Sequence, residues 1–162
     1  MIPRLQVLVA LAWLLSLAGC GYRSGALIPP HVESVHVEMF DNETFRRELE
    51  IPLTRALKDE VARRTNLRLA TAGAADSTLS GTITRVRARA IVYDQADEVL
   101  TQDITVHVRF EWRDARGRLL SSSTVSETVQ RFAPRDETQA DAVQAAIQDL
   151  AERIIEEMQE GF

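Results

Sequence analysis

Arginine is the residue best placed for binding chemistry in this sequence. Arg85, Arg87 and Arg89 occupy alternate positions in a segment rich in Thr, Ile and Val. Alternation places side chains on one face of a β-strand, and a guanidinium group suits bidentate contacts with phosphate or carboxylate. The pattern predicts a basic patch on an open sheet face, where an anionic headgroup or an acidic partner docks. A solvated face with cross-strand pairs to Asp103 and Glu111 is the alternative.

The predicted patch extends beyond one strand. If the following strand forms a hairpin with the arginine segment, His107, Arg109 and Arg113 lie beside it. Arg131 and Arg135 form a second, weaker cluster where a strand meets a helix. The candidate contacts for an anionic lipid or a partner are therefore Arg85, Arg87, Arg89, Arg109, Arg131 and Arg135.

Motifs for catalysis, metals and cofactors are missing from the sequence. His31, His36 and His107 have no metal-ligand spacing, and there is one cysteine, no C-x-x-C and no glycine-rich phosphate loop. The serines at 121–123 lack a G-x-S-x-G elbow, and Glu156-Glu157 are successive helical positions, which do not share a face. We therefore expect a binding or assembly protein with no catalytic residues, no cofactor and no metal.

The single cysteine follows a leader-like segment. Residues 5–19 form an apolar run after Arg4 that is too short to span a bilayer and is typical of a signal peptide. The run ends in L-A-G before Cys20, as in a bacterial lipobox, so we expect Cys20 to carry lipid and to begin the mature chain. The alternative is an ordinary cleavage site with a free cysteine. Gly21, in place of aspartate, implies the outer membrane by the enterobacterial sorting rule.

Length and charge limit the other possibilities. A chain of 162 residues without internal repeats suits one domain, and a net charge of −5 argues against nucleic-acid binding. The acidity is concentrated in residues 136–160, which hold eight Asp or Glu and one Arg. We expect a lipoprotein signal peptide over 1–19, a lipid-anchored spacer over 20–32 and a single domain over 33–162.

Hydrophobic periodicity predicts the elements that position the patch. Asp41-Asn42-Glu43 is expected to break the first strand, and Pro52 to start a regular helix near Glu50. The apolar phase changes around Thr84-Arg85, which predicts a β-bulge or a change of buried face. Strands are expected over 31–40, 67–69, 77–94, 104–113 and 119–132, the last at a sheet edge, and helices over 46–64 and 137–160.

These elements favour one fold class. Two helices with one apolar stripe each and half-buried strands close by packing in two layers. The predicted fold is α+β, a two-layer sandwich with two amphipathic helices on one face of a mixed, mostly antiparallel four- to five-stranded sheet. One parallel pair is permitted through a right-handed crossover.

Several motifs follow one another along the expected mature chain. It starts C-G-Y, continues through a proline-containing spacer to F-D-N-E-T-F, and enters a helix with a leucine pattern. Further motifs are ADSTLSG, VYD and ITVHVRFEWRDARGRLL with its D-x-x-G turn. Their order resembles the LptE family of lipopolysaccharide-assembly lipoproteins, and the resemblance covers nearly the whole mature chain.

The resemblance implies an outer-membrane lipoprotein on the periplasmic side that forms a complex with the β-barrel LptD. Such proteins plug the barrel, assist its assembly and bind lipopolysaccharide, and their fold has two helices on a mixed four-stranded sheet. A lipoprotein activator of a peptidoglycan synthase is the alternative binding function. An envelope hydrolase is the alternative from a different class, and it requires a nucleophile with a nearby base that the sequence does not offer.

Overall fold

A computed structural model of the chain describes residues 28, 31–93, 99–132 and 139–160. The predicted signal peptide, Cys20, the turn at 95–98 and Arg135 lie outside these residues. The elements are β1 (Ser34–Val37), β2 (Asp41–Asn42), α2 (Glu50–Arg64), β3 (Arg68–Leu69), β4 (Ser77–Tyr93), β5 (Val99–Asp114), β6 (Leu119–Phe132) and α3 (Gln139–Glu160).

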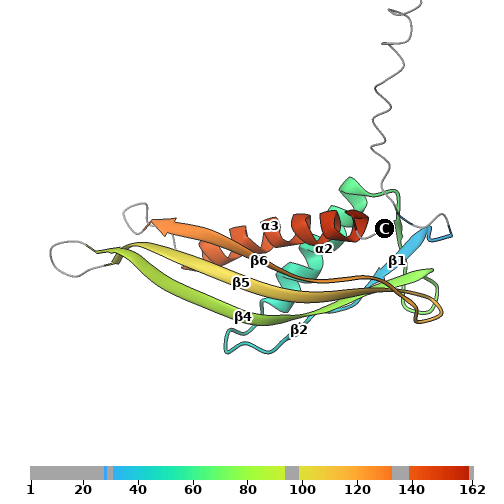
Figure 1. Cartoon of the computed structure of the whole chain (residues 1–162), viewed down its shortest axis with the longest axis horizontal. Coiled ribbons are helices and arrows are strands. Elements are labelled where there is room, and N and C mark those ends of the chain that lie inside the picture. Colours follow the sequence, from blue (N-terminus) through green and yellow to red (C-terminus); the bar gives the residue numbers. More distant parts are fainter. Residues whose placement is uncertain (1–27, 29–30, 94–98, 133–138, 161–162) are drawn as a thin grey trace, which may run out of the picture.

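The strands form one mixed sheet, and both helices lie on the same face of it (Figure 1). The strand order is β3-β1-β4-β5-β6, and β2 pairs with β4 beside β1. The pairs β1–β3, β1–β4 and β2–β4 are parallel, whereas β4–β5 and β5–β6 are antiparallel. The predicted α+β two-layer sandwich is confirmed, with six strands among the described residues, and β6 lies at the predicted edge.

Helix α2 begins and ends where the sequence predicts. Pro52 lies in the first turn, where its missing N–H costs nothing, so the regular helix starts at Glu50. At the other end, the backbone N–H and the hydroxyl of Thr65 both donate to the carbonyl of Val61, at 3.2 and 2.8 Å. The apolar side chains on its inner face are fully buried, as at Leu53 and Leu57.

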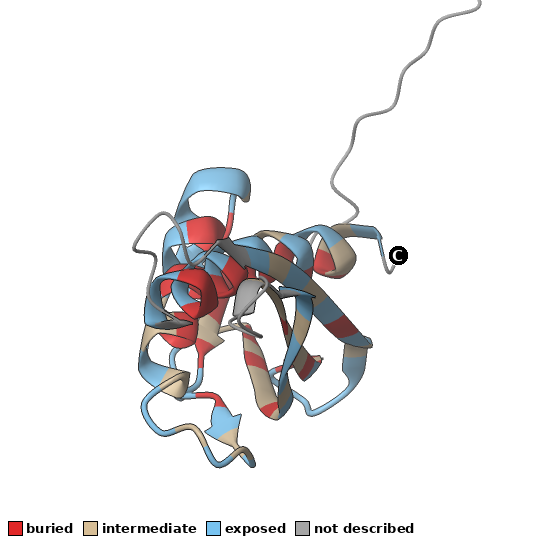
Figure 2. Cartoon of the chain, turned by 90° about the vertical axis from the view of Figure 1, so that its left-hand side faces the viewer, coloured by how far each residue is buried: buried red, intermediate tan, exposed pale blue. Residues whose placement is uncertain are grey.

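Helix α3 lies over β5 and β6 and beside α2 (Figures 1 and 2). It contributes nine of the 26 buried apolar side chains among the described residues, from Ala142 to Met158. Its contact with α2 also includes charges: the Arg64 guanidinium lies 2.9 Å from Glu60 and 2.5 Å from Glu152. The Gln159 amide donates to the Arg64 carbonyl.

The first predicted strand needs a correction. It is expected over 31–40, but β1 covers only Ser34–Val37, and the Asp41-Asn42 pair expected to break it forms β2 beside β4. The reason is a set of contacts between segments that are distant in the sequence. Phe40 is buried against Gly81, and its N–H donates to the Thr54 hydroxyl at 3.1 Å, which holds the chain close to the edge of β4.

The bulge predicted in β4 is present. The register with β5 shifts between Ile83 and Arg85, so that Leu79 and Ile83 face the helices before the shift and Val86 does so after it. On β5 the alternation is regular, and the buried series runs from Ile104 to Trp112. The bulge keeps apolar residues on the inner face and turns the arginines of β4 to the outer face.

Candidate anion-binding face of the sheet

The outer face of β4 and β5 carries the predicted arginine patch. Arg85 is the cross-strand partner of His107, Arg87 of Thr105 and Arg89 of Asp103. Because residues two apart on a strand share a face, the three arginines and His107 lie on the side of the sheet opposite the helices. The sequence-based prediction of one shared face is confirmed for these residues.

Arg109 extends the patch, whereas Arg113 does not. Arg109 shares the outer face with His107, two residues away on β5, and it is the partner of Thr82 on β4 and Thr124 on β6. Arg113 lies four residues further along β5 and forms an ion pair with Glu111 at 2.7 Å. Its charge is therefore already balanced at the far end of the strand.

The predicted counter-charges do not neutralise the patch. Glu111 pairs with Arg113, and Asp103, although opposite Arg89, forms no ion pair with it within the described part of the chain. In the same residues, Arg85 and Arg87 have no carboxylate within ion-pair distance. The cross-strand ion pairs to Asp103 and Glu111 in the solvated alternative are therefore not formed among the described residues, whereas the solvent-exposed arginine side chains that it expects are present.

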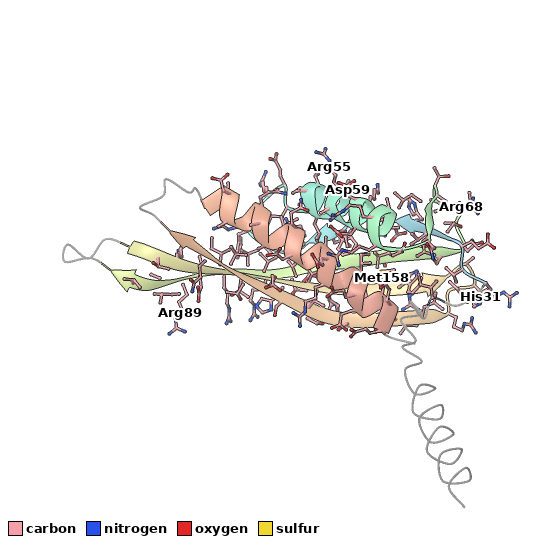
Figure 3. The ribbon with its side chains drawn as sticks, turned by 90° about the horizontal axis from the view of Figure 1, so that it is seen from above. His31, Arg55, Asp59, Arg68, Arg89 and Met158 are labelled. Carbon is pink, nitrogen blue, oxygen red and sulfur yellow. The ribbon has the colours of Figure 1, made fainter. Side chains whose placement is uncertain are left out.

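We call the four exposed side chains Arg85, Arg87, Arg89 and Arg109 the arginine face. Figure 3 places Arg89 towards the β4–β5 hairpin end of the sheet and His31 and Arg68 at the opposite end. Thr and Ser side chains of β5 and β6 surround the arginines, and the Thr105 and Thr128 hydroxyls hydrogen-bond each other at 2.9 Å. The face thus offers cations among hydroxyl groups, a combination that suits phosphate oxygens.

The second predicted cluster cannot be assembled in the same way. Arg131 belongs to β6 and pairs with Gln102 of β5, but its side chain is not among those described. Arg135 lies outside the described residues. Both stay predictions from the sequence.

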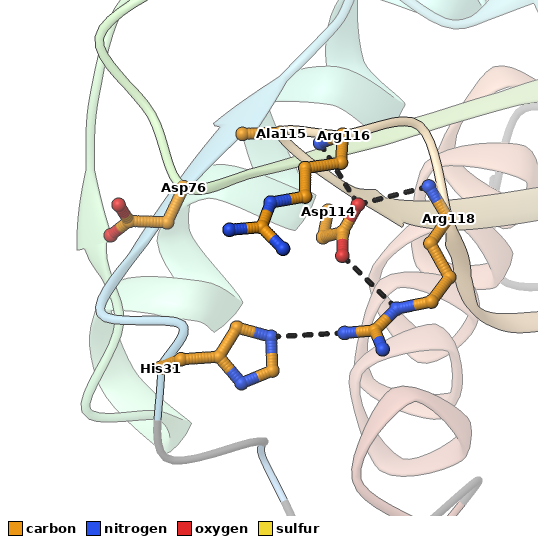
Figure 4. A pocket seen from close by; sticks show the side chains of 6 residues that line it. All are labelled: His31, Asp76, Asp114, Ala115, Arg116 and Arg118. Carbon is orange, nitrogen blue, oxygen red and sulfur yellow. Dashed lines mark hydrogen bonds and ion pairs between the residues drawn. The ribbon is translucent and has the colours of Figure 1, made fainter.

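A polar pocket that the sequence analysis did not single out lies at the opposite end of the sheet (Figure 4). It has a volume of about 530 Å³ and combines two carboxylates, one imidazole and two guanidinium groups. The lining residues are His31, Asp76, Asp114, Ala115, Arg116 and Arg118. The sequence indicates only one part of this pocket, the D-x-x-G turn at Asp114, because the other lining residues come from segments distant in the sequence.

The two carboxylates of the pocket act as hydrogen-bond acceptors for the backbone. Asp114 accepts from the N–H groups of Arg116 and Arg118, both at 2.9 Å, and forms an ion pair with the Arg118 guanidinium. Asp76 accepts from the Ser34 hydroxyl at 2.7 Å and the Glu33 N–H at 3.2 Å. Arg118 also contacts the His31 ring at 3.3 Å.

These bonds hold both acids in the ionised form. The Ser34 hydroxyl and the Glu33 N–H lower the pKa of Asp76, and the backbone N–H of Arg118 lowers the pKa of Asp114. A general acid at neutral pH requires the opposite shift. Asp76 therefore holds the segment that enters β1, Asp114 holds the β5–β6 turn, and neither carboxyl group is set up as a general acid.

Several solved structures share the fold of this chain. The chain is similar to PelC from Paraburkholderia phytofirmans, with 17% identity, 80% of this chain and 89% of that chain covered, and a TM-score of 0.57. It is similar to a minor lipoprotein from Acinetobacter baumannii, with 12% identity, 79% and 93% coverage and a TM-score of 0.54. It is also similar to uncharacterized lipoprotein B from Nitrosomonas europaea, with 10% identity, 79% of this chain and 83% of that chain covered, and a TM-score of 0.54. At these identities the likeness shows a shared fold, an α+β domain also found in bacterial lipoproteins.

The family follows from a match over most of the domain. The family model LptE, lipopolysaccharide-assembly, matches residues 32–159, and the chain belongs to this family. The resemblance found in the sequence is thereby confirmed. A search of curated proteins finds no match. Within the described ranges, no helix is both long enough and apolar enough to cross a membrane.

Proposed function

We propose that this chain is a non-enzymatic outer-membrane lipoprotein that partners an LptD-like β-barrel in lipopolysaccharide assembly. Cys20 carries the lipid anchor, the domain lies on the periplasmic side, and the arginine face contacts the phosphates of lipopolysaccharide. Family membership supports the assembly role. The lipobox supports the anchor, since the sole cysteine follows the apolar leader directly.

One observation carries the lipid-contact part of the proposal: the arginine face has four exposed guanidinium groups and no ion pair among the described residues. Lipopolysaccharide is a polyanion, and guanidinium–phosphate bonds are charge-assisted and bidentate. The non-enzymatic role is supported by membership of a lipopolysaccharide-assembly family.

The partner is tested by purifying the tagged protein from native outer membrane in mild detergent. A large β-barrel recovered in stoichiometric amount is the expected result. Recovery of a peptidoglycan synthase instead would support the alternative function, and recovery of the protein alone would refute the stable complex.

The lipid contact is tested by replacing Arg85, Arg87 and Arg89 with Ser. Exposed charge pairs contribute about 0.5–1 kcal/mol each, so three replacements should weaken lipopolysaccharide binding by about 10- to 100-fold. The matched control replaces Arg47, Arg55 and Arg116, which are equally exposed and lie elsewhere, and changes the net charge by the same amount. Equal loss in both triple variants would show a general charge effect and refute a specific arginine face.

A further inference from the structure

Among the residues that the structure describes, no strand pairs with the distal half of β4 on the side of β1 and β2. We call residues Arg85–Tyr93 of this strand the free edge. Towards β1, the last residues of β4 with a described partner are Thr82 and Ile83, which pair with β2. On the other side the free edge pairs with β5 as far as Val99. In an antiparallel pair, alternate residues direct their N–H and C=O groups away from the partner, so the free edge has unpaired main-chain groups.

The turn after β2 directs the chain away from the free edge. The Glu43 N–H donates to the Ile83 carbonyl at 3.0 Å, and this is where β2 stops. The Asn42 side chain then turns the chain away: its oxygen accepts from the Thr44 N–H and hydroxyl, and its amide nitrogen donates to the Arg46 carbonyl. Because four hydrogen bonds fix this turn, including one from Asn42 to Glu50, β2 cannot continue along β4.

Neither helix contacts β4 extensively, and of the described side chains of the free edge only Val86 packs against the core. Helix α2 contacts β1 and β3, and α3 contacts β5 and β6. Beyond Val86 the free edge is open: Ala88 on the inner side is exposed, and Ile91 and Val92, where the register with β5 shifts, are each 44% exposed. Phe45, on the turn after β2, is fully exposed. Apolar side chains gathered beside unpaired main-chain groups are typical of a surface that binds another chain.

Charge selects the kind of partner. A second copy paired edge to edge would bring two sets of Arg85, Arg87 and Arg89 onto one side of a shared sheet, and like charges across strands are destabilising. An incoming strand with carboxylates on that side and aliphatic side chains on the other complements both surfaces. The free edge has nine residues, or roughly 30 Å at about 3.3 Å per residue, and Arg85–Ala90 pair with β5 in unbroken register.

We propose that the free edge of β4 binds an extended segment of another protein by β-strand addition, and that this segment alternates acidic and aliphatic residues. The added strand continues the line of β2, bonds to the main chain of Arg85–Tyr93, and places its carboxylates beside the three arginines. This inference goes beyond lipid binding, because its central contacts are main-chain hydrogen bonds that a phosphate group does not form along a strand.

The test uses the mature protein and a labelled nine-residue peptide, acetyl-Glu-Val-Glu-Val-Glu-Val-Glu-Val-Glu-amide. The control peptide has the same composition with its Glu and Val residues in separate blocks. Binding is measured by fluorescence polarisation, and amide hydrogen exchange locates the bound strand. We expect binding of the alternating peptide to be at least about tenfold tighter than that of the control, with slowed exchange at alternate amides of Arg85–Tyr93.

The edge strand β6 is an internal control, since its outer side carries Ser and Thr and no arginine between Ser122 and Thr128. Its amides should exchange unchanged. Replacing Arg85, Arg87 and Arg89 with Ser should weaken the peptide about tenfold, whereas replacing Arg47, Arg55 and Arg116 should not. Equal binding of both peptides, slowed exchange in β6 instead of β4, or binding without any slowed exchange would overturn the proposal. A stable homodimer through β4 would overturn the choice of partner.

Discussion

The hydrogen bond between Thr54 and Phe40 gives a sharp test of how the fold is held together. The Thr54 hydroxyl is buried in α2 and accepts the Phe40 N–H at 3.1 Å. Thr54→Val keeps the shape of the side chain but removes the acceptor, which leaves a buried donor unpaired. Such a loss costs about 1–3 kcal/mol. For a domain of this size, about 2 kcal/mol corresponds to a fall in Tm of roughly 4–8 °C.

The control is Thr54→Ser, which keeps the hydroxyl and loses one methyl group, at a cost of about 1 kcal/mol. Both variants are measured by urea unfolding of the mature protein, with the fluorescence of the fully buried Trp112 as the signal. We expect Val to be the more destabilising replacement although it is the more apolar one. A Val variant as stable as the wild type would refute the reasoning, because it would mean that the Phe40 N–H does not depend on Thr54.

Three further predictions test the fold and the anchor. Gly81→Ala should lower the Tm by several degrees, because a Cβ at this position meets the Phe40 ring and, at 2.6 Å, the Arg109 carbonyl. Gly117→Ala is the comparison: a Cβ there has open space around it, but φ is +78°, so this variant measures the cost of backbone strain alone. Asp76 and Asp114 have lowered pKa values, so their contribution to stability is complete above about pH 4 and is lost as the pH falls through their folded pKa values. Urea midpoints measured down to about pH 2.5 should therefore fall less steeply in the double Asn variant; an equal slope would contradict this account. Cys20→Ser should release the protein from the membrane fraction, and unchanged membrane association would refute the lipid anchor.

The elements that the sequence predicts well are those determined by local pattern. The alternation from Ile104 to Trp112 identified β5, and the change of phase around Thr84 located the bulge that the register shows. Hairpin pairing then brings Arg85 beside His107, since antiparallel neighbours follow from the order of the strands. These predictions hold because the interacting residues are close in sequence or share one simple periodicity.

Other parts of the fold and the site depend on contacts between distant segments. The two-residue strand β2 has no periodicity of its own and forms because Phe40 binds Thr54 and packs on Gly81. Glu111 pairs with Arg113 rather than with Arg109, which is a choice between two guanidinium groups at equal spacing along the strand. Whether a helix covers the distal half of β4 also depends on packing between distant segments, and the sequence of that strand does not predict it.

The contribution of α3 to the core has a consequence for the order in which the chain folds during its synthesis. About a third of the buried apolar side chains among the described residues come from this helix, and Arg64 binds it across more than eighty intervening residues. A chain synthesised from its N-terminal end therefore exposes the inner surfaces of β5 and β6 until α3 has emerged. The core is completed only then, and a nascent chain that lacks α3 exposes the kind of apolar surface that chaperones bind.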